Sequence, residues 1–449
     1  MSRIERILWY LFILFLPTQL GKHFWPDFTI VTGIRIDYLS PTLYTTDLLV
    51  FGLFICSLIR GLSHIRSSKK KNIYKAFPIN KKRYLFAFLV ILFLLCSTVL
   101  SIRPLLSLYG LLKLLECVFL VVYISRMIYQ YKQLQKITFL FACSSLFESL
   151  LAIGQYVVQG SLNGVFYFFG ERTFTGSTPG IANADINGEL VLRPYATFPH
   201  PNVLAGYELI TIILLFSFLL NNSNRMNKIF GIIVICIDSI ALVLTFSRVV
   251  IFLWVIIIFA TAIRLLSQKM KSFKKKVTAS FIAIFFLIFI GLLPVTHDVI
   301  SRFSQLSLTD ESVTQREMLL TASWQMISMH SLFGVGLYNF IPSLAPLEKP
   351  LSLSLYLQPV HNIYFLIASE IGFPGLGIFI WLLYVIAKKL SNQNEKVKKS
   401  LAVIFSSILI TGAFDHYWLT LQQGQLLFSL IIGLTFTTFV SRHQKNPRT

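Results

Sequence analysis

The sequence has few charged residues for its length. Only 13% of its 449 residues are Asp, Glu, Lys or Arg, whereas a soluble domain carries about 25%. The acidic residues are the scarcer group, with 19 Asp and Glu against 40 Lys and Arg. Because 55% of the chain is hydrophobic, the composition excludes an ordinary soluble enzyme and indicates an integral membrane protein.

Cysteine is also rare, and its placement excludes two kinds of site. No two cysteines have CxxC spacing, so we expect neither a disulfide framework nor a thiolate metal site. The sequence lacks GxxxxGKS/T, GxGxxG, HExxH and GxSxG motifs. It also lacks a paired-carboxylate motif on its predicted outer side, so we expect no metal and no cofactor. All five cysteines lie in apolar stretches: Cys56, Cys96, Cys117, Cys143 and Cys236.

Long apolar stretches recur along the chain, and each can cross a hydrocarbon core of about 30 Å as a helix. They predict an all-α integral membrane protein with about twelve transmembrane helices. The first stretch is not followed by a small-residue cleavage site, so we read it as a span and not as a signal peptide. The predicted spans run near residues 4–20, 43–60, 84–101, 104–125, 137–158, 202–220, 229–246, 248–266, 277–296, 362–387, 400–415 and 420–440.

Lys and Arg are concentrated in every second loop between these spans. The only acids in those loops are Glu5 and Glu395. Because short basic loops stay in the cytoplasm, we predict one polytopic domain over residues 1–449, with both termini cytoplasmic and two long outer loops at 159–201 and 297–360. The basic residues lie at helix ends, so we expect the lipid bilayer as a partner and no nucleic acid. The basic loops lie near residues 3–6, 60–83, 126–136, 225–228, 264–276, 388–399 and 442–448.

The two predicted outer loops are long, and loops of this length usually carry function in a compact protein. The first loop is rich in Gly, Asn, Pro and Thr. The second contains a predicted amphipathic helix at 315–329, because Met318, Leu319, Ala322, Met326 and Met329 follow helical spacing. A helix of this kind can lie at the membrane surface.

Two arginines stand out on the predicted outer side. Arg248 sits in LTFSRVVIFL, between two spans with almost no loop, so we place its guanidinium at the outer mouth of the bundle. A charge there is costly unless it is paired or faces water, and snorkelling to the interface is the alternative. Arg316 opens the predicted amphipathic helix, where a solvated surface charge is the alternative to a binding role. The other outer cations are Lys22, Arg35, Arg103, Arg172, Arg193, Arg302 and Lys349.

Histidine and asparagine mark the points where both outer loops return to the membrane. His200 and Asn202 follow Arg193 in RPYATFPHPNVLAGY, where prolines restrict the backbone at the start of a span. Asn202 fits an N-cap equally well. His361 and Asn362 close the second outer loop. A histidine beside a water-filled mouth can act as a general base near neutral pH, although a structural role is also open for His361.

Four segments occur in a fixed order around the two long outer loops. They are LRPYATFPHPNVLAGY, LTFSRVVIFLW, the helix that contains Arg316, and PVHNIYFLIASEIGFPGLG. Together they resemble the O-antigen ligase and polymerase family of integral-membrane glycosyltransferases. The resemblance covers roughly residues 100–440, whereas the opening third is similar only in its hydropathy and in IDYLSPTLYTTDLL.

The resemblance implies metal-independent transfer of a glycan from a polyprenyl diphosphate carrier, at the outer face of a bacterial inner membrane. The acceptor would be a hydroxyl of a glycolipid, of another glycan or of a protein. Arg248 and Arg316 would hold the diphosphate by paired hydrogen bonds, and His361 would activate the acceptor. A single displacement of this kind inverts the anomeric centre.

The other residues of these motifs are expected to bind substrate. They are Arg193, His200 and Asn202 at the end of the first outer loop, and Asn362 beside the expected base. Asn362 would orient either the sugar or the loop.

Other readings stay open at this point. Within the family, a repeat-unit polymerase or a protein O-oligosaccharyltransferase would use the same residues on another acceptor. A transporter of lipid-linked sugars or small anions is the reading from a different class, because Lys113 and Glu116 can pair within a predicted span. Asp415 and His416 form a further polar pair at the last outer turn.

Overall fold

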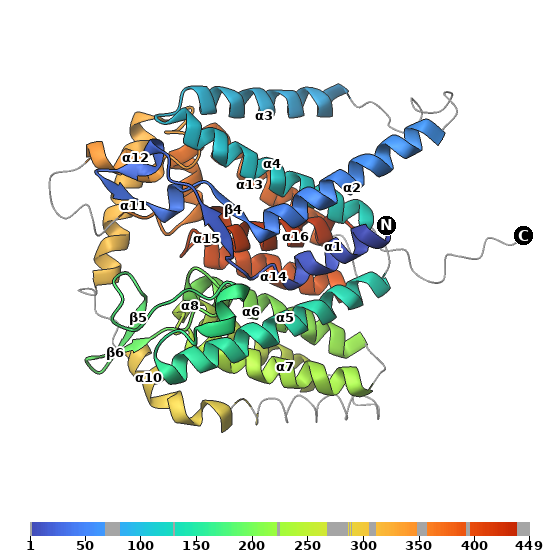
Figure 1. Cartoon of the computed structure of the whole chain (residues 1–449), viewed down its shortest axis with the longest axis vertical. Coiled ribbons are helices and arrows are strands. Elements are labelled where there is room, and N and C mark those ends of the chain that lie inside the picture. The colour runs from blue at the N-terminus through green and yellow to red at the C-terminus, as the bar shows by residue number, and fades with distance from the viewer. Residues whose placement is uncertain are drawn as a thin grey trace, which may run out of the picture.

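The computed structural model of the chain describes residues 2–67, 81–128, 131–221, 225–266, 286, 288, 290–304, 311–347, 357–391 and 396–437. Most of these residues are helical. Figure 1 shows the long helices running side by side, with short strands and helices gathered at the end of the molecule away from the N-terminus. We call this end the outer end, in line with the sidedness predicted from the basic loops.

The bundle consists of helices that follow the predicted spans. Proline begins two of them, α4 and α6, where its fixed φ suits the first helical turn. The helices are α1 (Arg3–Leu14), α2 (Thr45–Ser67), α3 (Lys81–Val99), α4 (Pro104–Met127), α5 (Tyr131–Val158), α6 (Pro201–Asn221), α7 (Arg225–Leu244), α8 (Arg248–Leu266), α13 (Ile363–Ser391), α14 (Lys396–Gly412) and α16 (Gln422–Phe436).

The outer end carries shorter elements. Its helices are α10 (Thr296–Ser304), α11 (Glu311–Met329), α12 (Phe340–Leu344) and α15 (Tyr417–Thr420), and 3-10 turns lie at Asp27–Thr29, Asp37–Leu39, Gly164–Phe169, Leu293–Val295 and Ala345–Leu347. Its strands pair antiparallel, β1 (Gly21–His23) with β4 (Thr42–Tyr44), β2 (Ile30–Val31) with β3 (Ile34–Arg35), and β5 (Asn183–Ile186) with β6 (Glu189–Leu192). Asn187 and Gly188 join the last pair with positive φ at both residues, as a tight hairpin turn requires.

The helices support an integral membrane protein of the all-α class. Six of those described are long and apolar enough to cross a membrane: 45–63, 104–127, 133–158, 201–219, 226–244 and 363–391. Two more, at 84–99 and 248–263, are apolar but shorter. The count of twelve spans, the side on which each loop lies and the division into two outer loops stay predictions. The predicted span at 277–296 and the basic loop at 264–276 fall largely outside the described residues, and the basic segment at 442–448 falls wholly outside them.

The first predicted span is shorter than expected. It was predicted to run to about residue 20, but α1 ends at Leu14. Pro17 follows, and proline cannot donate a helical hydrogen bond. The Thr18 hydroxyl donates to the carbonyl of Phe169 at 2.6 Å, so the chain after α1 is bound to the first outer loop instead of continuing the helix.

α6 lies at the centre of the bundle. Of its most apolar window, 83% is buried, against 28% for α4. It packs against α5, α7 and α14, and its apolar side chains belong to the main hydrophobic core. The outer end of α6 is therefore held firmly by the packing around it.

α13 breaks once inside the bundle, at Gly372, whose φ is +69 and which is followed closely by Pro374. A break in a membrane helix frees carbonyl groups that must find other donors. The carbonyls of Ser369 and Glu370 accept hydrogen bonds at 2.9 and 2.8 Å from backbone N–H groups of the segment 331–336. The chain that follows α11 is thereby fixed against α13.

The helix predicted at 315–329 lies within α11. Its buried side chains include Leu319 and Met326, whereas Met318 and Met329 are 51% and 67% exposed, so the predicted apolar face is buried only in part. Ser323 Oγ lies 2.6 Å from Ser369 Oγ of α13. α11 therefore packs against α13 along part of its length.

Lys113 is closed into a polar network between helices. Its Nζ lies 2.8 Å from Asp47 Oδ1 and 3.3 Å from Glu116 Oε2. Gln422 of α16 also donates to Asp47. The network joins the first turns of α2 and α16 to the middle of α4, so it accounts structurally for charges inside the membrane.

A second buried lysine closes the other end of α16. Lys398 is 1% exposed. Its Nζ donates to the carbonyls of Leu434, Thr435 and Thr437 at 3.1, 2.7 and 2.9 Å. A cation suits the end of a helix, where carbonyl groups lack intrahelical partners.

Candidate functional site

Three parts of the chain that are far apart in sequence meet at the outer end of the bundle. His361 and Asn362 stand at the start of α13. Asp415 and His416 form the turn between α14 and α15. His200 directly precedes α6. Because the packed helices hold these starts and turns, the side chains on them are placed with little freedom.

Asp415 is the residue through which these parts are connected. Asp415 is 7% exposed, and its carboxylate accepts hydrogen bonds from Asn202 Nδ2 at 2.6 Å and from the His416 backbone N–H at 2.8 Å. His361 Nδ1 lies 3.6 Å from Asp415 Oδ1. A carboxylate that faces Nδ1 keeps the proton on that nitrogen and leaves Nε2 basic. His361 thus has the arrangement of a general base oriented by a carboxylate.

Arg193 extends this network to the first outer loop. Its Nη2 donates to Asn202 Oδ1 at 2.5 Å, and its Nε donates to the Thr245 carbonyl at 2.6 Å. Asn202 is therefore held between Arg193 and Asp415. The N-cap contact of α6, considered above for Asn202, belongs to His200, whose Nδ1 accepts from the Asn202 backbone N–H at 3.1 Å.

Asn362 caps α13. Its Oδ1 accepts from the backbone N–H groups of Tyr364 and Phe365 at 2.9 and 3.1 Å, and its Nδ2 donates to the Ala413 carbonyl at 3.0 Å. These contacts fix the backbone one residue after His361. The predicted substrate-binding role of Asn362 stays a prediction, and its positioning role follows from the geometry.

Burial decides the protonation of this cluster. It lowers the pKa of His200 to about 3 and that of His416 to about 3, so both imidazoles are neutral at neutral pH. Burial alone would raise the pKa of Asp415. The neighbouring imidazole of His361, aided by the other two histidines, holds that pKa well below its usual range. Asp415 is therefore a carboxylate over the whole physiological range.

The charges of arginines in α10 and α11 act on Arg193 and on the cluster. Burial, together with the like charges of Arg302 in α10 and Arg316 in α11, lowers the pKa of Arg193 to about 10, so Arg193 stays charged at neutral pH. The charge of Arg316 also contributes to the lowered pKa of His416. Arg248 begins α8, close in sequence to the carbonyl that Arg193 binds.

Comparison with known proteins adds one decisive observation. Residues 231–380 match the family model of the O-antigen ligase. Over this segment the chain is similar to the O-antigen ligase family. The resemblance inferred from the sequence motifs is thereby confirmed. A search of curated proteins finds no match to the chain.

The O-antigen ligase domain holds only part of the site. Arg248, Arg302, Arg316 and His361 lie within its range. The residues that orient His361 or belong to its cluster lie before and after the domain in sequence: Arg193, His200, Asn202, Asp415 and His416. The site is thus completed by segments outside the O-antigen ligase domain.

The segment 193–200 is fastened to α5. Gln155 Oε1 accepts two consecutive backbone N–H groups of this segment at 2.9 and 2.8 Å, and its Nε2 donates to the Ala196 carbonyl at 3.1 Å. Ala196 has φ +50, a conformation that such contacts must hold. Glu148, two turns earlier in α5, accepts from the Thr197 backbone N–H at 3.0 Å and from its hydroxyl at 2.9 Å. α5 therefore sets the position of the chain that carries Arg193.

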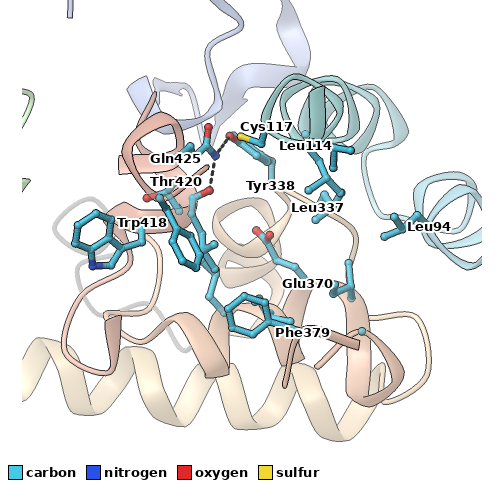
Figure 2. A pocket seen from close by; sticks show the side chains of 18 of the residues that line it. Leu94, Leu114, Cys117, Leu337, Tyr338, Glu370, Phe379, Trp418, Thr420 and Gln425 are labelled. Carbon is cyan, nitrogen blue, oxygen red and sulfur yellow. Dashed lines mark hydrogen bonds between the residues drawn. The ribbon is translucent and has the colours of Figure 1, made fainter. Parts of the chain in front are cut away.

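An apolar cavity of about 480 Å³ lies beside the cluster, walled by α3, α4, α13 and α16. Thr420 at its outer end has Oγ1 2.7 Å from His416 Nδ1, and the ring of Tyr38, which also lines it, lies 5.4 Å from the His416 ring. Figure 2 shows Glu370 and Gln425 among side chains that are mostly apolar. A cavity of this kind suits a hydrocarbon chain.

His361, Asp415 and His416 also have the spacing of metal ligands. Their ligand atoms lie within 4.8 Å of one another, the one such group in the part of the chain that the structure describes. Two imidazoles and a carboxylate suit Zn²⁺ or Fe²⁺. The expectation of a metal-free site rests on the sequence motifs and stays a prediction, which a chelator tests.

Two residues of the site could not be assigned from the sequence. Asp415 is separated by 213 residues from Asn202, and no local pattern indicates that they touch. The available signal was an acid directly before His416 at an outer turn. Nothing in the sequence distinguishes Arg302 from the other outer cations.

Proposed function

We propose that the chain transfers a glycan from a polyprenyl diphosphate carrier to an acceptor hydroxyl at the outer face of the bacterial cytoplasmic membrane. The observation that carries the proposal is the pairing of His361 with Asp415, because it joins an O-antigen ligase domain to an oriented base. Arginines and an apolar cavity beside the same pair supply the two other things that this reaction needs, an anion site and a place for a lipid.

In the proposed step, His361 Nε2 accepts the proton of the acceptor hydroxyl. The hydroxyl oxygen forms a bond to the anomeric carbon of the donor while the bond from that carbon to the diphosphate oxygen breaks. The carrier diphosphate leaves with the electron pair, and the anomeric centre inverts. Asp415 stabilises the imidazolium that forms, since its carboxylate faces Nδ1.

Guanidinium groups form the proposed diphosphate site. We assign Arg248 and Arg316 to the diphosphate, with Arg193 at its edge. Guanidinium groups bind diphosphate oxygens by paired hydrogen bonds and stabilise the charge that develops on the leaving group. The like charges near Arg193 support the assignment, because converging cations repel one another unless an anion lies between them. The reaction as proposed needs no metal.

We place the polyprenyl tail in the apolar cavity, whose outer end reaches His416 through Thr420. His200 is proposed to bind a sugar or phosphate oxygen: its Nδ1 already accepts a hydrogen bond, so its Nε2–H is free to donate. Asn202 and Asn362 are assigned positioning roles, because their amides hold Asp415 and the start of α13.

Transfer by the purified protein tests the proposal. The donor is a glycan linked to a polyprenyl diphosphate, and the acceptors are a glycolipid, a free glycan and a serine-containing peptide, each with and without EDTA. We expect transfer to one acceptor class in the presence of EDTA. Activity that EDTA abolishes and Zn²⁺ restores would contradict the metal-free mechanism. No transfer to any acceptor would overturn the function.

Matched variants test the arginine site. Arg248→Lys and Arg316→Lys should each lose at least about tenfold in rate, because an ammonium group lacks the planar fork of a guanidinium. Arg35→Lys is the control, since Arg35 is exposed and stacked over Trp25 at 5.8 Å. Snorkelling arginines would tolerate Lys, so near-normal transfer by both variants would defeat the assignment.

Variants of His361 test the base. His361→Ala should lose about 10²–10⁴-fold in rate, whereas donor binding should survive because the diphosphate is held elsewhere. His361→Gln keeps a hydrogen-bonding group but cannot take the proton. A fully active His361→Gln protein would leave His361 as a positioning residue only.

The transporter reading was based on Lys113 and Glu116, which do pair and which Asp47 of α2 joins. It stays an alternative, and the transfer assay tests it. Placement of the site at the outer face rests on the basic loops, and single cysteines test it. A cysteine at Gln159 should react with an impermeant thiol reagent in intact cells, and one at Ser63, beside the basic loop at 60–83, should not. The reverse labelling would overturn the topology.

A further inference from the structure

α10 is docked so that its rotation about its own axis is fixed. The Ser301 hydroxyl donates to Asn187 Oδ1 in the β5–β6 turn at 2.9 Å. One turn earlier, Asp298 Oδ2 accepts from the Tyr156 hydroxyl of α5 at 3.1 Å. The two contacts tie α10 to both α5 and the first outer loop. Arg302, in the last turn of α10, is therefore held in one direction.

Arg302 does not use the acid that its own helix offers. Asp298 lies four residues earlier, the spacing at which a helix forms ion pairs, but it takes its hydrogen bond from Tyr156. Arg302 Nε is buried and has no hydrogen-bond partner among the described residues. Among the described residues, the charge of Arg302 instead contributes to the lowered pKa of Arg193.

A buried guanidinium nitrogen without an acceptor, close enough to another guanidinium to act on its charge, is an unfavourable arrangement for the protein alone. An anion between these guanidinium groups makes the arrangement favourable, because each N–H then gains a charged acceptor. Arg193, Arg302 and Arg316 come from three different elements, which is how a protein surrounds a ligand rather than pairs with one neighbour.

We infer that Arg302 is a further guanidinium of the diphosphate site, and that it binds the leaving diphosphate more strongly than the diphosphate of the intact donor. This inference rests on the proposed function. In the donor the diphosphate is esterified at both ends and carries two negative charges. When the bond to the sugar breaks, the departing oxygen gains the electron pair, and the terminal phosphate group acquires a further charge with a pKa near 6. An additional cation therefore stabilises the transition state more than the ground state.

Kinetics separate this role from simple binding. In Arg302→Gln we expect kcat to fall about 10- to 100-fold, as for the loss of a hydrogen bond to a charged group, while the KM of the donor stays within about twofold. Arg302→Lys keeps the positive charge, so its kcat should lie between those of wild type and Arg302→Gln. Arg35→Gln, an exposed outer arginine away from the cluster, is the matched control and should behave as wild type.

Inhibition by farnesyl diphosphate, an analogue of the departing carrier, gives a second readout. Its inhibition constant should rise at least about tenfold in Arg302→Gln, and that of farnesyl monophosphate should change less. If Arg302→Gln does not fold, Arg302→Lys provides both measurements. An unchanged kcat, or a raised KM with unchanged kcat, would overturn the inference while leaving the proposed function intact. If the wild type transfers no glycan, direct binding of farnesyl diphosphate to wild type and Arg302→Gln still decides whether Arg302 belongs to an anion site, and equal affinity would overturn it.

Discussion

Replacing Asp415 with asparagine is the sharpest test of the site, because the change preserves the shape of the side chain and alters only its hydrogen-bonding character. The carboxylate meets N–H groups from Asn202 at 2.6 Å and from the His416 backbone at 2.8 Å, and it faces His361 Nδ1 at 3.6 Å. An ionised carboxylate accepts on both oxygens, whereas an amide accepts on one side and donates on the other.

Either orientation of the new amide conflicts with a neighbour. If its NH₂ group faces Asn202, the Asn202 amide must turn over and direct its own NH₂ group at Arg193. If it faces His361, it donates to Nδ1 and moves the imidazole proton to Nε2, the nitrogen that must stay basic. Loss of a hydrogen bond to a charged group costs about 1.5–3 kcal/mol, which corresponds to about 10- to 150-fold in rate.

The assay measures kcat and the donor KM for wild type and Asp415→Asn, with Asp37→Asn as a control at an exposed acid. We expect kcat to fall by the factor above and the donor KM to change little, because the proposed diphosphate site consists of arginines and does not include Asp415. Melting temperatures show whether each variant is folded. A folded Asp415→Asn protein with wild-type kcat would refute the view that Asp415 orients the base.

Two further predictions concern stability. The pKa values of His200 and His416 are about 3 in the folded protein and near 6.5 in the unfolded chain. Their contribution to the free energy of unfolding is therefore complete above pH 6.5 and is lost as the pH falls below it. At pH 5.5 each of these two histidines should lower the free energy of unfolding by about 1.4 kcal/mol. Unfolding measured at pH 8 and 5.5 should show this difference, and His416→Gln should remove about half of it; equal stability at both pH values would contradict it. Lys398→Met leaves three carbonyl groups at the end of α16 without their donor. It should lower the free energy of unfolding by about 2–5 kcal/mol, while kcat per folded molecule stays unchanged. An unchanged melting temperature would contradict this prediction and show that water replaces the ammonium group.

The helices could be predicted from the sequence because their signals are local. The predicted span at 104–125 corresponds to α4 at Pro104–Met127, since its apolar run and its initial proline both lie within the segment itself. The end of α1 could not be predicted in the same way, because the contact of Thr18 with Phe169 joins residues 151 positions apart. The break in α13 had a local signal in Gly372 and Pro374, but the backbone donors that stabilise it come from 331–336.

The candidate site shows the same difference between local and long-range signals. His361, Arg248 and Arg316 could be chosen from the sequence, because their motifs stand at predicted membrane boundaries. Asp415 could not be assigned a role, since what distinguishes it is a set of neighbours brought together by the packing of α6, α13 and α14. Asn362 looked like a binding residue because it adjoins His361, yet its amide is used to cap α13.

The dependence of the site on Asp415 has a consequence for how the protein is made. A polytopic chain enters the membrane from its N-terminus onward, so the O-antigen ligase domain at 231–380 is inserted before the turn that carries Asp415. Until that turn arrives, His361 has no carboxylate facing Nδ1 and Asn202 has no partner for its amide NH₂. A nascent chain can therefore display all of its outer arginines and remain inert. If the proposed function holds, competence to react begins only when the last outer turn is in place, and unfinished chains do not consume the lipid-linked donor.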